Sequence, residues 1–171
     1  MSSKMSKKRS NLKGLRAIVL TVSDSCAAGL RQDESGALLS RLLKKKGARV
    51  VRQEIVGDER VLIKKKLIGY GKNGLIDLVL TSGGTGFGPR DVTPEATVAV
   101  IEREARGLSE LIRQEGMKKT KTAVLSRGVA GLKGTTLIIN LPGSPKGARE
   151  SFEAIEALIP HAMAMIRGEG H

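Results

Sequence analysis

The chain has 171 residues, of which 40% are hydrophobic and 2% aromatic, with 30 lysines and arginines against 17 acidic residues. This composition favours a globular protein over a disordered one, and the length suits one domain. No run approaches the roughly 18 apolar residues that span a bilayer, and no apolar stretch follows the charged N-terminus as in a signal peptide. Because the single cysteine, Cys26, cannot form an internal disulfide, we expect a cytoplasmic protein without a membrane anchor.

The net charge of +13 suggests a polyanionic partner, either nucleic acid or a phosphorylated ligand. Five of the basic residues and none of the acidic ones lie in residues 1–13. We therefore expect a basic, disordered leader over 1–13 and a single folded domain over 14–171. Because aromatic residues are scarce, a base-stacking surface is disfavoured, and a basic nucleic-acid-binding module is the weaker alternative.

Strands and helices are expected to alternate along the first half of the chain. Apolar runs predict three strands, at residues 15–22, 48–56 and 75–80. Leucines at helical spacing predict a first helix with Ser35 as its cap and an end before Gly47. A second, amphipathic helix is expected to run through Ile68, with Asp58 as one candidate N-cap.

The second half of the chain continues the same pattern. Thr93 as cap and Pro94 in the first turn predict a helix whose buried stripe includes Val98, Ile101 and Ala105. Two further strands, 129–132 and 135–141, flank Lys133-Gly134. A closing helix is expected to kink or restart at Pro160. Strands that alternate with helices predict an α/β fold, a three-layer α/β/α arrangement with a mostly parallel central sheet.

Three polar or glycine-rich loops follow predicted strands. They are residues 23–25, 82–91 and 141–147. In open α/β sheets ligands bind beyond the carboxyl ends of the strands, so these loops are expected to converge on one cleft. Glycines let backbone N–H groups approach phosphate oxygens, which favours a nucleotide, although most loop glycines merely satisfy turns. The loops match neither the P-loop nor the dinucleotide fingerprint.

The motifs TVSDS at 21–25, TSGGTGFGPRDVTPEAT at 81–97 and LPGSPKGA at 141–148 together resemble the molybdopterin adenylyltransferase family. The resemblance covers about residues 15–167. It implies the molybdenum-cofactor-biosynthesis fold and Mg-ATP-dependent adenylylation of molybdopterin, which gives adenylyl-molybdopterin and pyrophosphate. It also implies a homotrimer and a downstream molybdenum-insertion protein as a partner. ATP and molybdopterin are then substrates, and Mg²⁺ is the cofactor.

Two carboxylates are the candidate catalytic and metal-binding residues. By resemblance, Asp91 in the run PRDVTPE carries catalysis and binds Mg²⁺, and Asp58 helps to hold the metal or to orient the attacking phosphate. A divalent ion that clamps phosphate oxygens suits nucleotidyl transfer, which depends on positioning and charge neutralisation. The alternative for each residue is a structural one, since an aspartate at such a position also caps a helix.

The remaining candidates are expected to bind the substrates. They are Ser23, Asp24, Ser25, Ser82, Gly83, Gly84, Thr85, Gly86, Arg90, Gly143, Ser144 and Lys146. Glycines of the second loop would cradle phosphates, and Ser144 and Lys146 would bind phosphate where the last helix starts. Two alternatives stay open, because Lys146 also suits a solvated face and Arg90 also suits an ion pair. The segment 26–32, CAAGLRQ, departs from the family pattern, so the resemblance assigns no pterin contacts to it.

Three other functions are weighed against adenylyl transfer. A MoaB-type molybdopterin-binding protein of the same fold shares the GGTG and RDVTPE signatures and has weak or different activity. A scaffold role would need additional interaction domains, for which 171 residues leave no room. A nucleic-acid-binding module depends on the net charge alone. Both a molybdenum and a tungsten pathway fit the sequence.

Overall fold

The structure, a computed structural model, describes residues 11–169, so most of the expected basic leader lies outside the described residues. Leu12, which the leader prediction included, is fully buried in the core. Its N–H group donates a hydrogen bond to the carbonyl oxygen of Lys46 at 2.8 Å. The folded part of the chain therefore includes residues that were expected to belong to the leader.

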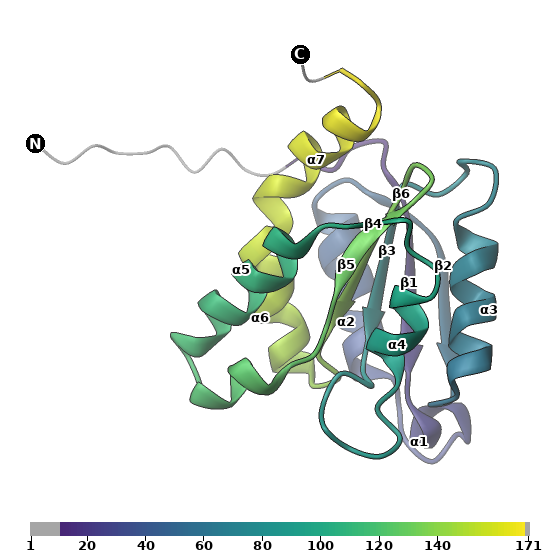
Figure 1. Ribbon diagram of the computed structural model, residues 1–171, viewed down its shortest axis with the longest axis vertical. Coiled ribbons are helices and arrows are strands. Elements are labelled where there is room, and N and C mark those ends of the chain that lie inside the picture. Colours follow the sequence, from purple (N-terminus) through teal and green to yellow (C-terminus); the bar gives the residue numbers. More distant parts are fainter. Residues whose placement is uncertain (1–10, 170–171) are drawn as a thin grey trace, which may run out of the picture.

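A six-stranded sheet forms the centre of the molecule (Figure 1). Its strands are β1 Arg16–Val22, β2 Arg49–Val56, β3 Leu78–Ser82, β4 Arg103–Glu104, β5 Ala130–Lys133 and β6 Thr136–Leu141. The spatial order is β2-β1-β3-β6-β5-β4. The pairs β1–β2, β1–β3 and β3–β6 are parallel, whereas β5–β6 and β4–β5 are antiparallel. The predicted α/β fold with a mostly parallel sheet is confirmed.

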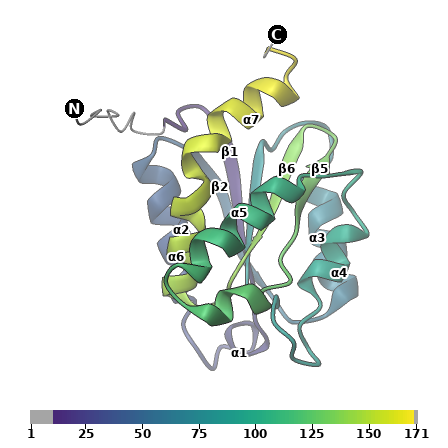
Figure 2. The same ribbon diagram turned by 60° about the vertical axis from the view of Figure 1, so that its left-hand side comes forward.

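Helices cover both faces of this sheet (Figures 1 and 2). The α-helices are α1 Asp24–Ala27, α2 Glu34–Lys45, α3 Arg60–Tyr70, α4 Thr93–Val98, α5 Arg106–Met117, α6 Pro145–Ile155 and α7 Ile159–Ile166, and two 3-10 helices are η1 Lys121–Leu125 and η2 Glu156–Leu158. Buried residues of α2, α5, α6 and α7 share one core, and those of α3 and α4 share the other. Within residues 11–169, none of these helices has the length and apolar character to cross a membrane.

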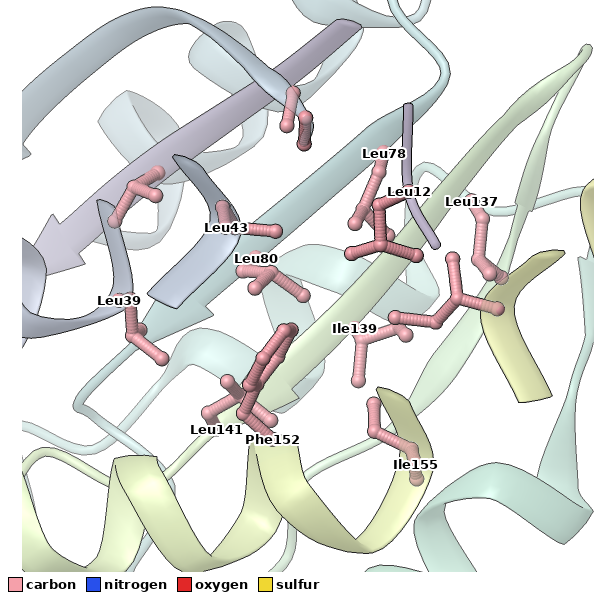
Figure 3. Packing of buried hydrophobic residues seen from close by; sticks show 14 of the residues in the cluster. Leu12, Leu39, Leu43, Leu78, Leu80, Leu137, Ile139, Leu141, Phe152 and Ile155 are labelled. Carbon is pink, nitrogen blue, oxygen red and sulfur yellow. The ribbon is translucent and has the colours of Figure 1, made fainter. Parts of the chain in front are cut away.

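The two cores follow from the alternation of side chains along the strands. In β1, Ala17 and Val19 pack into the core under α2 and α6, and Ile18 and Leu20 pack into the core under α3. Both sets are buried because helices cover both faces, so β1 reads as a continuous apolar run. Figure 3 shows Phe152 of α6 among the leucines of α2 and the sheet.

Several predicted helix boundaries are wrong by a few residues. Asp33, rather than Ser35, caps α2, because its carboxylate accepts a hydrogen bond from the Gly36 N–H at 2.8 Å. Thr93 is the first residue of α4, and Val98 is the last. Val98 is 49% exposed, and the helix does not continue to Ile101 and Ala105. These two residues still pack partly buried against the cores, but from the segment that contains the short edge strand β4 before α5.

The strand and turn predictions hold with smaller shifts. The third strand is Leu78–Ser82 instead of 75–80, so it reaches directly into the glycine loop. The hairpin β5–β6 exists, and Gly134 and Thr135 join its strands because β5 still includes Lys133. The closing helix restarts as predicted, with Pro160 in the first turn of α7.

Candidate active site

A cleft of about 390 Å³ lies beyond the carboxyl ends of the parallel strands. It is lined by Thr21, Val22, Ser23, Cys26, Arg31, Gln32, Asp33, Glu34, Ser35, Asp58, Ser82, Gly83, Gly84, Asp91, Gly143 and Ser144. Because the chain places β2 on one side of β1 and β3 on the other, the cleft occupies the topological switch point, where open α/β sheets bind ligands. In Figure 1, α1 and the loop that follows β3 lie together at this end of the sheet.

The glycine loop after β3 lies too close to neighbouring segments to accommodate side chains at Gly83 and Gly84. Gly83 has φ +104°, and a Cβ built there would lie 2.2 Å from the carbonyl oxygen of Val22 at the end of β1. Gly84 has φ +67°, and a Cβ there would lie 2.3 Å from Thr93 Oγ1 and 3.2 Å from Asp58 Oδ1. Both positions favour glycine sterically, and the loop backbone therefore lies directly against the cleft.

Asp24, Asp58 and Arg90 form a hydrogen-bonded group at the rim of the cleft. The Asp24 N–H donates to Asp58 Oδ2 at 2.8 Å, and the Asp58 N–H donates to Asp24 Oδ1 at 2.9 Å. Arg90 donates two bonds of 3.0 Å to the Asp24 carboxylate. The Arg90 hydrogen bonds lower the pKa of the Asp24 carboxyl below its usual value. Asp58 therefore does not cap α3, whose N-cap residue is Glu59.

Asp58 and Asp91 each keep one carboxylate oxygen without a hydrogen bond from the described part of the chain. Asp58 Oδ2 accepts from Asp24, and Asp91 Oδ2 accepts from the Gly88 N–H at 2.8 Å, which leaves both Oδ1 atoms. Burial raises the pKa of the Asp58 carboxyl above its usual value, and the charges of Asp24 and Asp91 add to this increase. The cleft therefore concentrates negative charge that a cation would relieve.

A further acidic residue, Asp33, also lines the cleft and was not among the predicted site residues. Its Oδ2 accepts a hydrogen bond of 2.7 Å from Thr21 Oγ1, and its Oδ1 caps α2. Ser82 Oγ donates to the carbonyl oxygen of Pro142 at 2.9 Å and lies 3.1 Å from Ser35 Oγ. These bonds tie the ends of β1 and β3, the start of α2 and the loop after β6 into one rigid surface.

Of the predicted site residues, the structure brings eight to the wall of the cleft. They are Ser23, Asp58, Ser82, Gly83, Gly84, Asp91, Gly143 and Ser144. The others lie nearby without lining it. Ser25 is within 3.1 Å of Ser23 Oγ, and Thr85 and Gly86 continue the glycine loop. Lys146 is an exposed residue in the first turn of α6, whose N-cap is Ser144.

Arg127 holds the glycine loop from outside the cleft, and no sequence pattern indicated this role. Its guanidinium contacts the carbonyl oxygens of Gly86 and Asp91 and pairs with Glu95. Burial alone would raise the pKa of the Glu95 carboxyl, but the hydrogen bond from Arg127, a backbone hydrogen bond and the charges of Arg127 and Arg60 together outweigh this effect, so the pKa is lowered. Because 36 residues separate Arg127 from Asp91 in the chain, no local spacing links the two.

A larger, apolar groove of about 580 Å³ lies between α5, α7 and the strands β5 and β6. Arginines and apolar side chains line it, and within residues 11–169 no acidic side chain does. A Mg²⁺-nucleotide needs carboxylate oxygens and approachable backbone N–H groups, which the smaller cleft supplies. Size alone therefore does not identify the functional site of this molecule.

The fold and the cleft define a class: an α/β protein with a polar, glycine-lined cleft at the switch point of a mostly parallel sheet. Comparison with known proteins then identifies the family. Residues 18–161 match the family model described as "Probable molybdopterin binding domain". The chain belongs to this family.

Individual relatives cover nearly the same part of the chain. The molybdopterin adenylyltransferase of Helicobacter pylori (strain ATCC 700392 / 26695) is 43% identical over 152 residues, 88% of this chain and 86% of that protein. The Drosophila melanogaster molybdenum cofactor synthesis protein cinnamon is 46% identical over 86% of this chain. The matched region is only 25% of the length of the fly protein. The crystal structure of the molybdopterin biosynthesis enzyme MoaB from Thermus thermophilus has a TM-score of 0.85 and 49% identity, covering 90% of this chain and 97% of the other.

Proposed function

We propose that this chain is a molybdopterin adenylyltransferase of molybdenum cofactor biosynthesis. A phosphate oxygen of molybdopterin attacks the α-phosphorus of ATP, the bond to the bridging oxygen of the β-phosphate breaks, and pyrophosphate leaves with that oxygen. The products are adenylyl-molybdopterin and pyrophosphate. The observation that carries the proposal is the cleft in which the glycine loop faces Asp58 and Asp91, in a chain that shares 43% identity with a molybdopterin adenylyltransferase.

The residues of the cleft fit a bound Mg²⁺. Nowhere in residues 11–169 do three metal-ligating side chains gather closely enough to hold an ion alone. Mg²⁺ commonly takes only one or two carboxylates and completes its shell with water and substrate phosphates. The free Oδ1 atoms of Asp58 and Asp91 suit this role, and the ion would neutralise charge on the phosphate oxygens.

The remaining groups would bind and orient the two substrates. The N–H groups of Gly84 to Gly86 would approach the phosphates, whereas the Gly83 N–H already donates to the carbonyl oxygen of Leu141 at 3.0 Å. The start of α6 at Ser144 would add its positive end. Ser23 and Ser25 would offer hydroxyl groups after β1, whereas the Ser82 hydroxyl already donates to the Pro142 carbonyl and holds the loop after β6 in place. We assign Asp24 and Arg90 to the rim, where each already holds the other.

Four further features stay predictions of this proposal. We expect a homotrimer, a cytoplasmic location, and transfer of the product to a molybdenum-insertion protein. We also place Lys146 near a substrate phosphate, supported by its position in the first turn of α6. Analytical ultracentrifugation tests the first of these directly, since a monomer would exclude the trimer.

A MoaB-type protein of weak or different activity is the second candidate. The structure of a MoaB at 49% identity favours it, but that protein is itself called a molybdopterin biosynthesis enzyme, so the likeness does not argue against enzymatic activity. The experiment that decides is incubation of the purified chain with molybdopterin and Mg-ATP beside an Asp91→Ala variant. We expect adenylyl-molybdopterin and pyrophosphate from the wild type and neither from the variant. A folded wild type that binds ATP and forms no product would favour the second candidate.

A further inference from the structure

Arg127 connects one segment of the chain to both ends of the glycine loop. It lies between η1 and β5, and its own N–H donates to the carbonyl oxygen of Thr85 at 2.8 Å. Its Nε donates to the carbonyl oxygen of Gly86 at 2.8 Å, and its Nη2 donates to that of Asp91 at 2.8 Å. Its Nη1 pairs with Glu95 in α4. One side chain thus spans the loop from its first turn to the helix that follows it.

The bonds of Arg127 reach Asp91 through the backbone. The Asp91 carbonyl is held by Arg127, while its N–H and its carboxylate are held by Gly88 inside the loop, at 3.0 Å and 2.8 Å. Without Arg127, the exposed Arg90–Asp24 pair would be the remaining side-chain contact between the loop tip and another segment. Arg127 adds three less exposed guanidinium bonds, to Gly86, Asp91 and Glu95, that fix this tip relative to α4.

A guanidinium is required for this arrangement. Nε, Nη1 and Nη2 lie in one plane and point to three different acceptors, each on a different residue of the loop or of α4. A lysine has the same charge, but its single ammonium group cannot reach three acceptors set along a planar fork. Replacement by lysine therefore keeps the charge and removes the geometry.

A second arginine holds the segment that carries Arg127. Arg113 of α5 donates from Nη1 to the carbonyl oxygens of Ser126 and Gly128, at 3.2 Å and 2.9 Å. These two carbonyls flank Arg127, so its backbone is fixed from the side of α5. Through Arg113 and Arg127, the loop tip is thus anchored to α5, a twelve-residue helix outside the cleft.

We propose that Arg127 is a positioning residue that sets the Asp91 carboxylate and the glycine-loop amides in the geometry that binds Mg-ATP. It does not line the cleft, so it acts through the loop rather than on the substrate. The proposal deepens the proposed function, because it names what fixes the metal-binding residue. The ordering of the loop by Arg127 does not depend on which phosphorylated substrate accepts the adenylyl group.

The test compares Arg127→Lys with Arg16→Lys in the full chain. Arg16 is a matched control, because its guanidinium also donates to a carboxylate, that of Asp77, and to a carbonyl oxygen, that of Gly74, each at 3.0 Å. Its partner Asp77 directly precedes β3, at the opposite end of that strand from the cleft. Both variants lose a comparable set of bonds, but only one of them loses bonds to the glycine loop.

Three measurements separate a positioning role from a structural one. Hydrogen exchange should speed up about tenfold or more at the amides of 84–91 in Arg127→Lys, and remain unchanged there in Arg16→Lys. Calorimetry should show that Mg²⁺ strengthens ATP binding roughly tenfold less in Arg127→Lys than in the wild type. kcat should fall roughly 10- to 100-fold, the scale expected for a misplacement of about 1 Å, while Arg16→Lys stays within about twofold.

A second variant, Glu95→Gln, keeps the proposal testable if Arg127→Lys does not fold. Glu95→Gln keeps Arg127 and weakens its anchor in α4, so exchange and Mg²⁺ dependence should shift in the same direction by a smaller factor. If both variants keep wild-type loop exchange and Mg-ATP affinity, the proposal is wrong, even if thermal stability falls. A wild type that binds Mg-ATP without adenylylating molybdopterin would overturn the proposed function alone, since exchange and binding still decide the role of Arg127.

Discussion

The two ends of the parallel sheet surround their carboxylates in opposite ways. At the amino end, Asp77 is 6% exposed, and Arg16 donates to its carboxylate from two nitrogen atoms and from the backbone N–H. Arg167 after α7 adds a contact of 3.5 Å. At the carboxyl end, Asp58 accepts one backbone hydrogen bond and faces the charges of Asp24 and Asp91.

The difference appears in the pKa values of the two groups. Burial alone would raise the pKa of the Asp77 carboxyl, but the bonds from Arg16 outweigh this and lower it. Burial raises the pKa of Asp58, and neighbouring carboxylates raise it further. The amino end therefore contributes to stability, and the carboxyl end stores unfavourable charge that a bound cation would relieve. Such a difference is expected because residues that bind a ligand often reduce the stability of the free protein.

The largest effect is expected from Asp91→Asn at the carboxyl end. The asparagine oxygen still accepts from the Gly88 N–H, so the loop should keep its shape, while the negative charge that would hold Mg²⁺ is lost. We expect kcat to fall on the order of 1000-fold, about 4 kcal/mol in the barrier, with nearly unchanged stability. Steady-state rates and urea unfolding of the same preparation check this. A fully active Asp91→Asn would remove Asp91 from the metal site.

The next largest effect is expected at the amino end, from Asp77→Asn. Arg16 and Arg167 lose their shared negative partner, and because Arg16 is partly exposed we expect a loss of about 2 kcal/mol in the free energy of unfolding. Catalytic rates should stay within about twofold. Urea denaturation at neutral pH measures the first effect. Loss of activity in a folded Asp77→Asn would contradict the division between the two ends.

The pH dependence of this loss has a definite sign. Because the pKa of Asp77 is lower in the folded state, its stabilisation is present above the unfolded value and is lost as pH falls below about 4. The wild type and Asp77→Asn should therefore converge in stability under acid. Thermal unfolding of both proteins at several pH values between neutral and acidic measures this convergence. A stability difference that stays constant with pH would show that titration of Asp77 is not its cause.

A smaller effect of the opposite sign is expected from Asp58→Asn. The amide oxygen can still accept from the Asp24 N–H, and the repulsion with two carboxylates disappears. We expect stability at pH 7 to rise by at most about 0.5 kcal/mol, since the site is partly open to water. This gain should vanish as pH falls through the raised pKa of Asp58, because the wild-type group is then neutral too. A clearly destabilised Asp58→Asn would contradict the inference that unfavourable charge at the carboxyl end reduces stability.

The smallest effect is expected from Arg90→Ala at the rim. The Arg90–Asp24 pair is 60% and 49% exposed, so its removal should change stability only slightly. Because Arg90 is already paired with Asp24, ATP affinity should weaken by no more than about threefold. Isothermal calorimetry measures this. A much larger loss of ATP affinity would indicate that Arg90 contacts a phosphate of ATP directly.

The sequence predicted the features that depend on local patterns. Apolar runs located β1 and β6 because buried strands need continuous hydrophobic residues, and the loops after them identified one end of the sheet. The resemblance supplied Asp58 and Asp91, which the structure places in one cleft. Local capping rules failed where a distant group competed, as for Asp58, whose carboxylate bonds to Asp24 and not to α3.

Contacts between distant segments could not be read from the sequence. Arg127 and Arg113 act on backbone carbonyls, which every residue has, so no residue pattern marks their partners. The role of Asp33 could not be predicted because its partners, Thr21 and Gly36, depend on how α2 meets β1. The short strand β4 was missed because two exposed charged residues show no alternation.

The most direct test of the central assignment follows a label in the α-phosphate of ATP. The wild type is mixed with molybdopterin, labelled ATP and Mg²⁺, and Asp91→Asn and Asp77→Asn are run in parallel. We predict that label passes to molybdopterin with the wild type and with Asp77→Asn, and that Asp91→Asn transfers almost none. Equal transfer by Asp91→Asn and the wild type would contradict the assignment of chemistry to the carboxyl end of the sheet.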